Sequence, residues 1–549
     1  HPLQKNMAGS NPLDGGPSKF AVNMTSGRQT ASAISREELL TSLVGEPALP
    51  LRARDKDRDR DDNDGDDQED SEDMEAPSSN SNSTSSSSSS SARLPHRHLG
   101  TWAVCFIAYF NVSGGAWGSE GIISDCGPLP GFLGIFIFMW MWGWPVVLVT
   151  SELASAFPAD GGYSIWVAEA FGEFWGFQES YLSWTSGVVD NALYPVLAYQ
   201  TAARIFGGVW GDPLPDEDSP AEGFSFSAYL IKLILVALFT IPNLMSTRSY
   251  GTSLGLAFAM VAIPFIVFAC ASLATAGATL SWGRLLEVKH DANWSDWSDL
   301  FSNLYWNWNG FDCVSTCAGE VKNPERSYLR GLSLSMVLIL FSYLVPLGVG
   351  VVHGAPDWKL WDAGWFSTIA DQQVGRWMSV WIVGACFVGN FGQYSAELFE
   401  DSWQLAGMAD AGLAPKFLGR RHKYFGTPWV SIIMQVCCIS VLVSFDFSSI
   451  LVVDNCFSVA GTMLELAAFM KLRISRPDLE RPWAIPIQKI WVLGLFLLFP
   501  FVLGTIVFLS CFYGESLGVC LTNVALLCGG PAVFWLSKKM GHREYSHYD

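Results

Sequence analysis

The sequence has little charge for its length, and positive charge is the scarcer sign. Of 549 residues, 15% are charged and 50% are hydrophobic, and the mean hydropathy is +0.25. Roughly a quarter of the residues of a soluble domain are charged, so this composition excludes an ordinary soluble protein of this size. The formal net charge of −19 gives no basis for a nucleic-acid partner.

Clusters of catalytic or metal-binding residues are missing as well. Cys313 and Cys317 lie at i and i+4, but no histidine or further cysteine completes a metal site beside them. No nucleophile is paired with a base at a suitable spacing. We therefore predict no enzymatic activity, no metal and no cofactor. A cleavable signal is also missing, so the first membrane span is expected to direct insertion.

Charge is concentrated in residues 1–99, where long apolar runs are absent. This segment holds seventeen acids and eleven bases, and it includes the runs "RARDKDRDRDDNDGDDQED" and "SNSNSTSSSSSSS". Such a composition cannot bury enough apolar surface to offset the entropy lost on ordering. Residues 1–99 are therefore predicted to form a disordered tail.

The rest of the chain is built from long apolar runs. A helix needs about 20 mostly apolar residues to cross a bilayer, and twelve stretches meet this requirement. We therefore predict an all-α integral membrane protein. The predicted spans are 101–125, 131–157, 174–206, 226–243, 252–276, 298–321, 331–353, 377–406, 428–445, 449–470, 490–511 and 517–536.

Lysine and arginine gather in the loops on one side of these spans. The loops on the same side as the tail carry most of them, for example Lys416, Arg420 and Arg421. By the positive-inside rule, the N-terminal tail and the C-terminal tail (541–549) are both cytoplasmic. The plasma membrane is the expected location. The sequon at Asn293 then faces outside and is a predicted glycosylation site.

Two spans are interrupted by glycine. The run "NVSGGAWGSEG" breaks the first span at Gly114 and Gly115, and "NWNGFD" breaks the sixth at Asn309 and Gly310. Non-helical backbone survives in a bilayer only where protein or a wet cavity surrounds it. Small residues also allow close helix packing, which is the simpler explanation for a single glycine cluster.

The two breaks occupy matching places in two halves of similar length. Residues 100–276 hold spans one to five, residues 298–472 hold spans six to ten, and residues 473–540 hold the last two spans. A unit of five spans must be followed by a copy that enters the membrane from the opposite side. This pattern is typical of an inverted-repeat transporter with its substrate site between the broken helices.

Acidic residues inside the predicted spans outnumber bases. The acids are Glu120, Asp190, Asp312, Glu397, Asp454 and Glu465. Against them the spans offer essentially one base, Lys232. An acid at the bilayer centre costs about 2.5–3.5 kcal/mol on insertion scales. Protons or a cationic substrate must therefore neutralise these groups.

Aromatic residues accompany the acids, and aromatic faces attract ammonium groups. Asp190 shares a helix face with Tyr194, and Glu397 lies one turn from Tyr394. Asp312 is equally suited to capping the second half-helix. The predicted substrate-binding residues are Gly114, Gly115, Trp117, Glu120, Asp190, Tyr194, Trp306, Asn309, Gly310, Asp312, Tyr394 and Glu397. Glu120 and Asp190 are the predicted proton-coupling residues.

Several longer motifs resemble a known transporter family. The run "GFDCVSTCAGEVKNPERS" resembles the sixth-span signature of the amino acid–polyamine–organocation (APC) superfamily. The runs "FPADGGYSIWVAEAFGEFWGFQ", "LSWTSGVVDNALYPVL" and "AELFEDSWQLAGMADAGLAP" are similar to its polyamine permease branch. The resemblance covers about residues 100–540 and leaves the tail without a counterpart.

The resemblance implies a fold and an activity. The fold is a LeuT-like five-plus-five inverted repeat of twelve helices, with helices 1 and 6 broken. The activity is import of putrescine or spermidine by alternating access, with protons as the coupling ion. The fifth span lacks the lysine that often replaces a sodium ion in this superfamily, so sodium is not excluded. The resemblance also assigns Gly118 to the first break.

Two other functions stay open at this point. A cationic or neutral amino-acid permease would use the same fold, and a non-transporting sensor of polyamines or amino acids would bind its ligand without moving it. All three readings share a small-molecule ligand and the lipid bilayer as partners. Protein partners cannot be named from the sequence.

Overall fold

The computed structural model of the chain describes residues 99–158, 161–210, 225–245, 250–277, 280–410 and 414–545. The predicted disordered tail lies outside the described residues apart from Leu99, as do the last four residues of the predicted C-terminal tail. The described residues are almost entirely helical. Their single β-bridge joins Leu99 to Val321.

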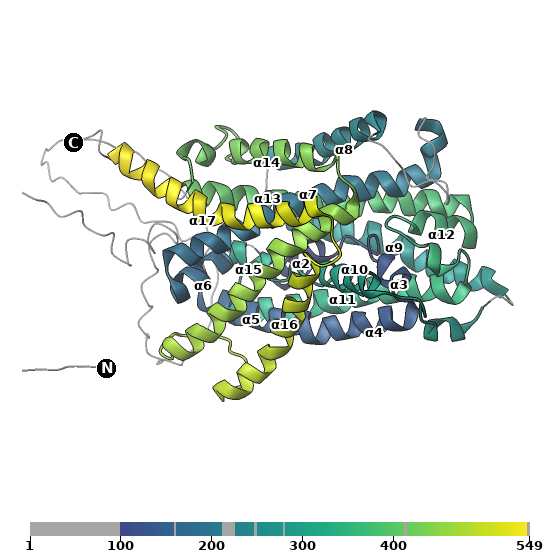
Figure 1. Ribbon diagram of the computed structural model, residues 1–549, viewed down its shortest axis with the longest axis horizontal. Helices are drawn as coiled ribbons and strands as arrows, with labels where there is room; N and C mark the ends of the chain where they lie inside the picture. The colour runs from purple at the N-terminus through teal and green to yellow at the C-terminus, as the bar shows by residue number, and fades with distance from the viewer. Residues whose placement is uncertain are drawn as a thin grey trace, which may run out of the picture.

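Long helices dominate the architecture, and α7 and α13 run side by side along the long axis of the molecule (Figure 1). The helices of twenty or more residues are α7 (Glu173–Trp210), α8 (Phe226–Met245), α9 (Tyr250–Ala276), α11 (Pro324–His353), α13 (Arg376–Asp410), α15 (Phe447–Ser475), α16 (Ile490–Ser510) and α17 (Leu517–Tyr545). Shorter segments are α4 (Pro128–Phe138), η1 (Met139–Gly143), α5 (Trp144–Ala156), α6 (Gly162–Phe171), η3 (Trp282–Leu286), η5 (Trp358–Leu360), α12 (Phe366–Gln373), η6 (Lys416–Gly419) and α14 (Trp429–Leu442).

Seven helices among the described residues are long and apolar enough to cross a membrane, judged by length and composition. They include the continuous α4–η1–α5 segment, α11 and α15. Large apolar side chains such as Leu256, Leu498 and Leu521 are more than 40% exposed on this surface. Water would oppose such exposure and lipid favours it, so these helices belong to a multi-pass membrane protein.

Both predicted breaks interrupt helices. Helix α2 (Thr101–Val112) ends just before the glycines of the first break, and α3 (Gly121–Ser124) follows it. Helix α10 (Trp294–Trp306) ends before the second break, and the 3₁₀ helix η4 (Cys313–Glu320) follows. Gly310 has φ +99°, and a Cβ atom at this position would lie 2.5 Å from the carbonyl oxygen of Asn111. The two breaks therefore touch each other, and glycine is needed where they meet.

The protein itself supplies hydrogen-bond partners to the broken segments. The Gly118 amide donates to Glu120 Oε2 at 2.7 Å. Asn307 Nδ2 donates to the Gly118 carbonyl at 3.4 Å, and the Tyr343 hydroxyl donates to the Asn307 carbonyl at 3.2 Å. Polar backbone groups inside a membrane protein must be satisfied in this way, since lipid cannot do so.

A buried ion-pair cluster ties α5 to α15 and the segment that follows it. Glu152 is fully buried and contacts the guanidinium groups of Arg473 and Arg481, the latter at 3.0 Å. The Ile485 amide donates to the same carboxylate at 2.8 Å. Glu152 thus has fixed positive partners, unlike most acids described below.

Replacing Glu152 with Gln should destabilise the protein. The variant leaves two partly buried guanidinium groups without their shared counter-charge, a loss that approaches the value of about 3–5 kcal/mol seen when one partner of a fully buried pair is removed. The thermal unfolding midpoint of the purified protein in detergent measures the effect. Glu173→Gln is the control, because its pair with Lys538 is exposed and should contribute about 0–1 kcal/mol. A midpoint for Glu152→Gln equal to that of the control would contradict the expectation.

Candidate functional site

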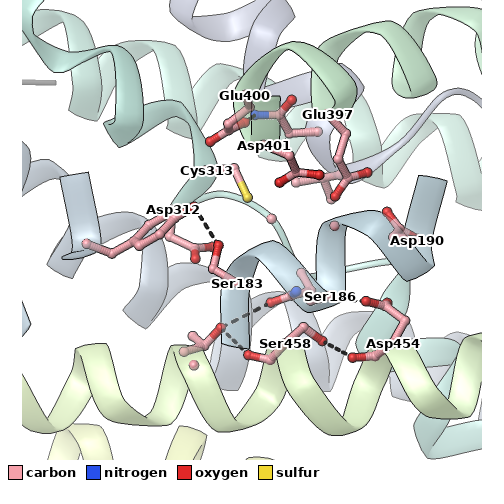
Figure 2. A pocket seen from close by; sticks show the side chains of 18 of the residues that line it. Ser183, Ser186, Asp190, Asp312, Cys313, Glu397, Glu400, Asp401, Asp454 and Ser458 are labelled. Atoms are coloured by element: carbon pink, nitrogen blue, oxygen red, sulfur yellow. Dashed lines mark hydrogen bonds between the residues drawn. The ribbon is translucent and has the colours of Figure 1, made fainter. Parts of the chain in front are cut away.

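A small acidic cavity lies between α7, α13, α15 and the second break. Its volume is about 60 Å³, which is room for a few water molecules. Eight carboxyl groups line it, and no lysine, arginine or histidine of the described residues does so. We call it the acidic cavity (Figure 2). The carboxyl groups belong to Glu179, Asp190, Asp312, Glu397, Glu400, Asp401, Asp454 and Glu465.

Helix α7 presents one polar face to the cavity. Glu179, Ser183, Ser186, Asp190 and Tyr194 all line it, and steps of three or four residues place them on one face of a helix. Helix α15 does the same with Asp454, Ser458, Gly461 and Glu465. The α7 and α15 faces meet across the cavity.

The two helices run in opposite directions along the cavity. Ser186 Oγ donates to Asp454 Oδ1 at 2.5 Å. Further toward the start of α7, the carboxylate of Glu179 faces Gly461, where a Cβ atom would lie 3.0 Å from its Oε1. Seven of the eight acids, all except Glu400, therefore form two groups. Asp190, Glu397, Asp401 and Asp454 form the Asp190 cluster, and Glu179, Asp312 and Glu465 form the Glu179 cluster.

Figure 2 shows Asp190 and Asp312 on opposite sides of the cavity. In the Asp190 cluster, Trp306 Nε1 donates to Asp190 Oδ1 at 2.7 Å. The Tyr194 hydroxyl is hydrogen-bonded to Asp190 and lies 2.7 Å from Glu397 Oε2. A hydroxyl carries one proton and can donate to only one of these carboxylates. The other carboxyl group must therefore be protonated, or a cation must lie beside it.

The Glu179 cluster has fewer partners. Glu179 is fully buried, and no N–H or hydroxyl donor of the described residues reaches either of its carboxyl oxygens. The carboxyl groups of Asp312 and Glu465 lie next to it. Asp312 Oδ1 also lacks a donor within the described part of the chain. Unpaired buried carboxylates are costly, so this cluster requires protons or a bound cation.

The acidic cavity continues into a larger one of about 590 Å³. Asn111, Cys313 and Glu400 line both cavities. Glu400 accepts hydrogen bonds from Thr316 Oγ1 at 2.7 Å and from Asn111 Nδ2 at 3.4 Å. The second cavity reaches residues on the predicted cytoplasmic side, such as Arg421. The second cavity therefore extends from the acidic cavity toward the loop that carries Arg421.

Contacts close the opposite end. Glu120 is fully buried and accepts from the amide of Phe366, the first residue of α12, at 3.2 Å. Arg204 Nη2 lies 3.3 Å from Asp362 Oδ2, and its guanidinium carbon lies 4.8 Å from the centre of the Trp365 ring. The segment before α12 is therefore held against α7 and the first break.

Seven of the twelve predicted binding residues line the acidic cavity. They are Asp190, Tyr194, Trp306, Asn309, Gly310, Asp312 and Glu397. Asp312 makes no side-chain cap on η4, so the capping role considered from the sequence is not the one it has.

The other five predicted residues do not line the cavity. Gly114 and Gly115 belong to the first break, and Glu120 accepts hydrogen bonds from backbone amides there. The Trp117 ring packs on Phe265 with centroids 5.0 Å apart. The Tyr394 hydroxyl pairs with Thr240 Oγ1 of α8 at 2.9 Å, and the Tyr394 ring packs on Phe239 of the same helix, so this side chain lies against α8 although it is one turn from Glu397.

Five acids of the cavity were not among the predicted binding residues. Asp454 and Glu465 are acids of a predicted span, whereas Glu179, Glu400 and Asp401 lie near predicted span ends. The signal that could have found Glu179 is its spacing of eleven residues from Asp190, three helical turns on one face. Asp454 and Glu465 repeat this spacing on α15. The base Lys232 instead donates to the Val443 carbonyl at 3.1 Å.

The helices and the cavity define a multi-pass membrane protein with a charged internal site. A family model described as amino acid permease matches residues 99–525. The chain therefore belongs to the amino acid permease family of the APC superfamily, and it is a transporter rather than an enzyme.

Similar proteins include plant and bacterial transporters. The polyamine transporter RMV1 of Arabidopsis thaliana is 33% identical over 70% of this chain and 74% of that protein. The polyamine transporter PUT1 of Oryza sativa subsp. japonica is 34% identical over 70% of this chain and 68% of that protein. The glutamate/serine transporter AimA of Bacillus subtilis is 22% identical over 70% of this chain and 73% of that protein.

Gly310→Ala should impair transport without removing the protein from the membrane. The φ angle of +99° costs a residue with a Cβ atom about 1–3 kcal/mol, and the new methyl group would push the two breaks apart. We expect the transport rate of the reconstituted protein to fall about ten-fold or more. Gly348→Ala is the control, because nothing lies within 4 Å of its Cβ position. Equal uptake by the two variants would contradict a tight contact between the breaks.

Proposed function

We propose that this chain is a secondary active transporter that imports polyamines such as putrescine and spermidine. The observation that carries the proposal is the acidic cavity, with eight carboxyl groups and no basic side chain of the described residues in its lining. A linear polyamine brings several positive charges into one site. It can therefore neutralise carboxylates that the protein leaves without counter-charges.

The aromatic residues of the cavity support this substrate class. Tyr194 and Trp306 hold Asp190 in place through hydrogen bonds, and their rings suit the methylene chain and the ammonium groups of a polyamine. The names of the Arabidopsis and rice relatives point to the same class. An amino acid would bring a carboxylate into a site already crowded with carboxylates, which disfavours the amino-acid permease alternative. The sensor alternative has no observation in its favour.

We propose that the fold is the twelve-helix, five-plus-five inverted repeat. The matching breaks at Gly114 and Gly310 support it, since each lies in the first helix of its half. The short helices support it too. Helix α6 follows the second predicted span and α12 follows the seventh, so the two halves share an extra element at the same place.

In an alternating-access cycle, the contacts at the two ends of the site would act as gates. In this proposal the structure represents a state open toward the cytoplasm through the second cavity. The outer end is closed by Glu120 beneath α12 and by Arg204 with Asp362. An outward-open state would break these contacts and seal the site near Glu400, as the broken-helix bundle rocks against the remaining helices.

Proton coupling follows from the same charge arrangement. A triamine brings at most three positive charges, so several of the eight carboxyl groups must carry protons when it is bound. Of the two residues predicted to couple protons, Asp190 lines the cavity, whereas Glu120 accepts backbone hydrogen bonds away from it. We therefore assign the coupling role to Asp190, together with Glu397 and the shared Tyr194 hydroxyl.

Reconstituted protein tests the substrate and the coupling ion together. Proteoliposomes should accumulate labelled spermidine when the outside is acidic, and a sodium gradient alone should drive much less uptake. Unlabelled putrescine should compete, whereas arginine and leucine should not. Binding of spermidine without accumulation would instead favour the sensor alternative.

Asp190→Asn is the matched variant in this assay. It keeps the shape of the side chain and an acceptor for Trp306 but removes the charge, so uptake should fall about ten-fold or more. Asp478→Asn, a change of an exposed acid that lines neither cavity, should transport normally. Normal uptake by Asp190→Asn would remove Asp190 from the site, and uptake that followed sodium would move the coupling role to that ion.

The orientation is part of the proposal, with both termini cytoplasmic and the protein in the plasma membrane. Asn293 is exposed at the start of α10, where its Oδ1 caps the helix by accepting from the amides of Ser295 and Asp296. Because only Oδ1 takes part in the cap, the Nδ2 atom of Asn293 is available for a glycan.

The same loop holds an ion pair. Asp296 accepts a hydrogen bond from Lys289 Nζ at 2.8 Å, and this contact raises the pKa of Lys289 and lowers that of Asp296.

Expression in a glycosylating host tests this orientation. We expect an N-glycan at Asn293, so enzymatic deglycosylation should increase the gel mobility of the wild-type protein. Ser295→Ala removes the sequon but keeps the backbone amides of the cap, and this variant should show no shift. A wild-type protein without a glycan would contradict the outward placement of the loop.

A further inference from the structure

The acidic cavity has a fixed length, set by two helices. Glu179 and Asp190 are eleven residues apart on α7, and Asp454 and Glu465 are eleven apart on α15. At 1.5 Å per residue, each pair is separated by about 16 Å along its helix. Because the helices run in opposite directions, Glu465 joins Glu179 at one end, and Asp454 lies beside Ser186 and Asp190 at the other.

The Glu179 cluster has fewer hydrogen-bond donors than the Asp190 cluster. Asp190 accepts hydrogen bonds from Trp306 and Tyr194, and Asp454 accepts one from Ser186. Glu179 is fully buried and lines the cavity, and no N–H or hydroxyl donor of the described residues reaches either of its oxygens. The carboxyl group of Glu465 lies within hydrogen-bonding reach of it, so the two can share a proton. One shared proton leaves the other acceptor sites of this pair open, and an ammonium group of the ligand would fill them.

We propose that the two clusters select substrates by length, favouring a linear amine whose terminal nitrogens are separated by about nine bonds. This inference rests on the proposed function, since it requires that the site binds polyamines. A charged N–H···O contact is about 3 Å long. If one ammonium group lies about 3 Å inside each end of the 16 Å separation, the two ammonium groups are about 10 Å apart.

Chain lengths decide which amine fits. An extended peptide advances about 3.3–3.6 Å for every three backbone bonds, so an extended alkyl amine advances about 1.1–1.2 Å per bond. The terminal nitrogens of spermidine, nine bonds apart, are then separated by about 10–11 Å. Those of putrescine, five bonds apart, are separated by only about 6 Å, so putrescine reaches one cluster at a time.

The length should persist while the site opens and closes. A cavity of about 60 Å³ is tight for a triamine, so we expect the second break or α13 to shift on binding. Helices α7 and α15 continue without interruption past both clusters. The spacing along each helix is set by helical rise rather than by the position of the breaks.

Competition by diamines of graded length tests the inference with the full-length reconstituted protein. Unbranched α,ω-diaminoalkanes from four to twelve carbons are measured against labelled spermidine uptake. We expect the tightest competition at 1,8-diaminooctane, whose nitrogens are also nine bonds apart, and about ten-fold weaker competition by the four-carbon diamine. An optimum at four carbons, or no dependence on length, would overturn the length selection while leaving polyamine transport intact.

A variant at the Glu179 end separates length selection from general hydrophobicity. Glu179→Gln should lower the preference for the eight-carbon over the four-carbon diamine about ten-fold, and Glu465→Gln serves if that variant does not fold. Asp478→Asn, a change of an exposed acid that follows α15 and lines neither cavity, should keep the wild-type preference. An unchanged preference in both cluster variants would overturn the inference. If spermidine is neither accumulated nor displaced by any amine, the proposed function itself fails.

Discussion

Carboxyl groups buried without counter-charges are the constraint on which the rest of the structure depends. Glu152 is a buried acid with fixed partners, since it lies between two guanidinium groups and a backbone amide. Its carboxylate is stabilised without any ligand. Around the acidic cavity the chain does the opposite and places eight carboxyl groups together. Such a site has a high affinity for protons and cations, since either relieves the desolvation and the mutual repulsion of the carboxylates.

The continuous helices and the broken helices have different roles around the acidic cavity. Helices α7 and α15 carry acids at both ends of the cavity on continuous backbone, whereas α2 and α10 stop at its edge. At the breaks the chain is held by replaceable contacts, such as Asn307 on the Gly118 carbonyl and Glu120 on the Phe366 amide. Motion at the breaks can therefore change access to the cavity without changing the spacing of the carboxyl groups that line it.

Local signals in the sequence were enough to place the breaks and part of the site. Gly310 and Asp190 stand out because each is a polar or flexible residue inside an apolar run. Glu179 did not stand out, since it lies between Gln178 and Ser180 near a predicted span end, and only its register relative to Asp190 points to the cavity. Glu120 was predicted to bind substrate, but it does not line the acidic cavity. In a non-helical segment no periodicity fixes the direction of a side chain, and this one turns toward the amides of Gly118 and Phe366.

A site with more carboxyl groups than its cargo has charges offers a simple route to coupling. In the proposed symport, the ammonium groups of a polyamine neutralise some of these carboxylates, and protons bound from the same side neutralise others. A proton and an ammonium group compete for any one carboxyl group, so the protons that travel with the amine must occupy carboxyl groups that the amine does not contact. Glu400 lines both cavities, so it lies where a proton released from the acidic cavity would pass toward the second cavity. An amine that spans both clusters leaves fewer carboxyl groups for protons than one that fills a single cluster, and it should therefore be transported with fewer protons.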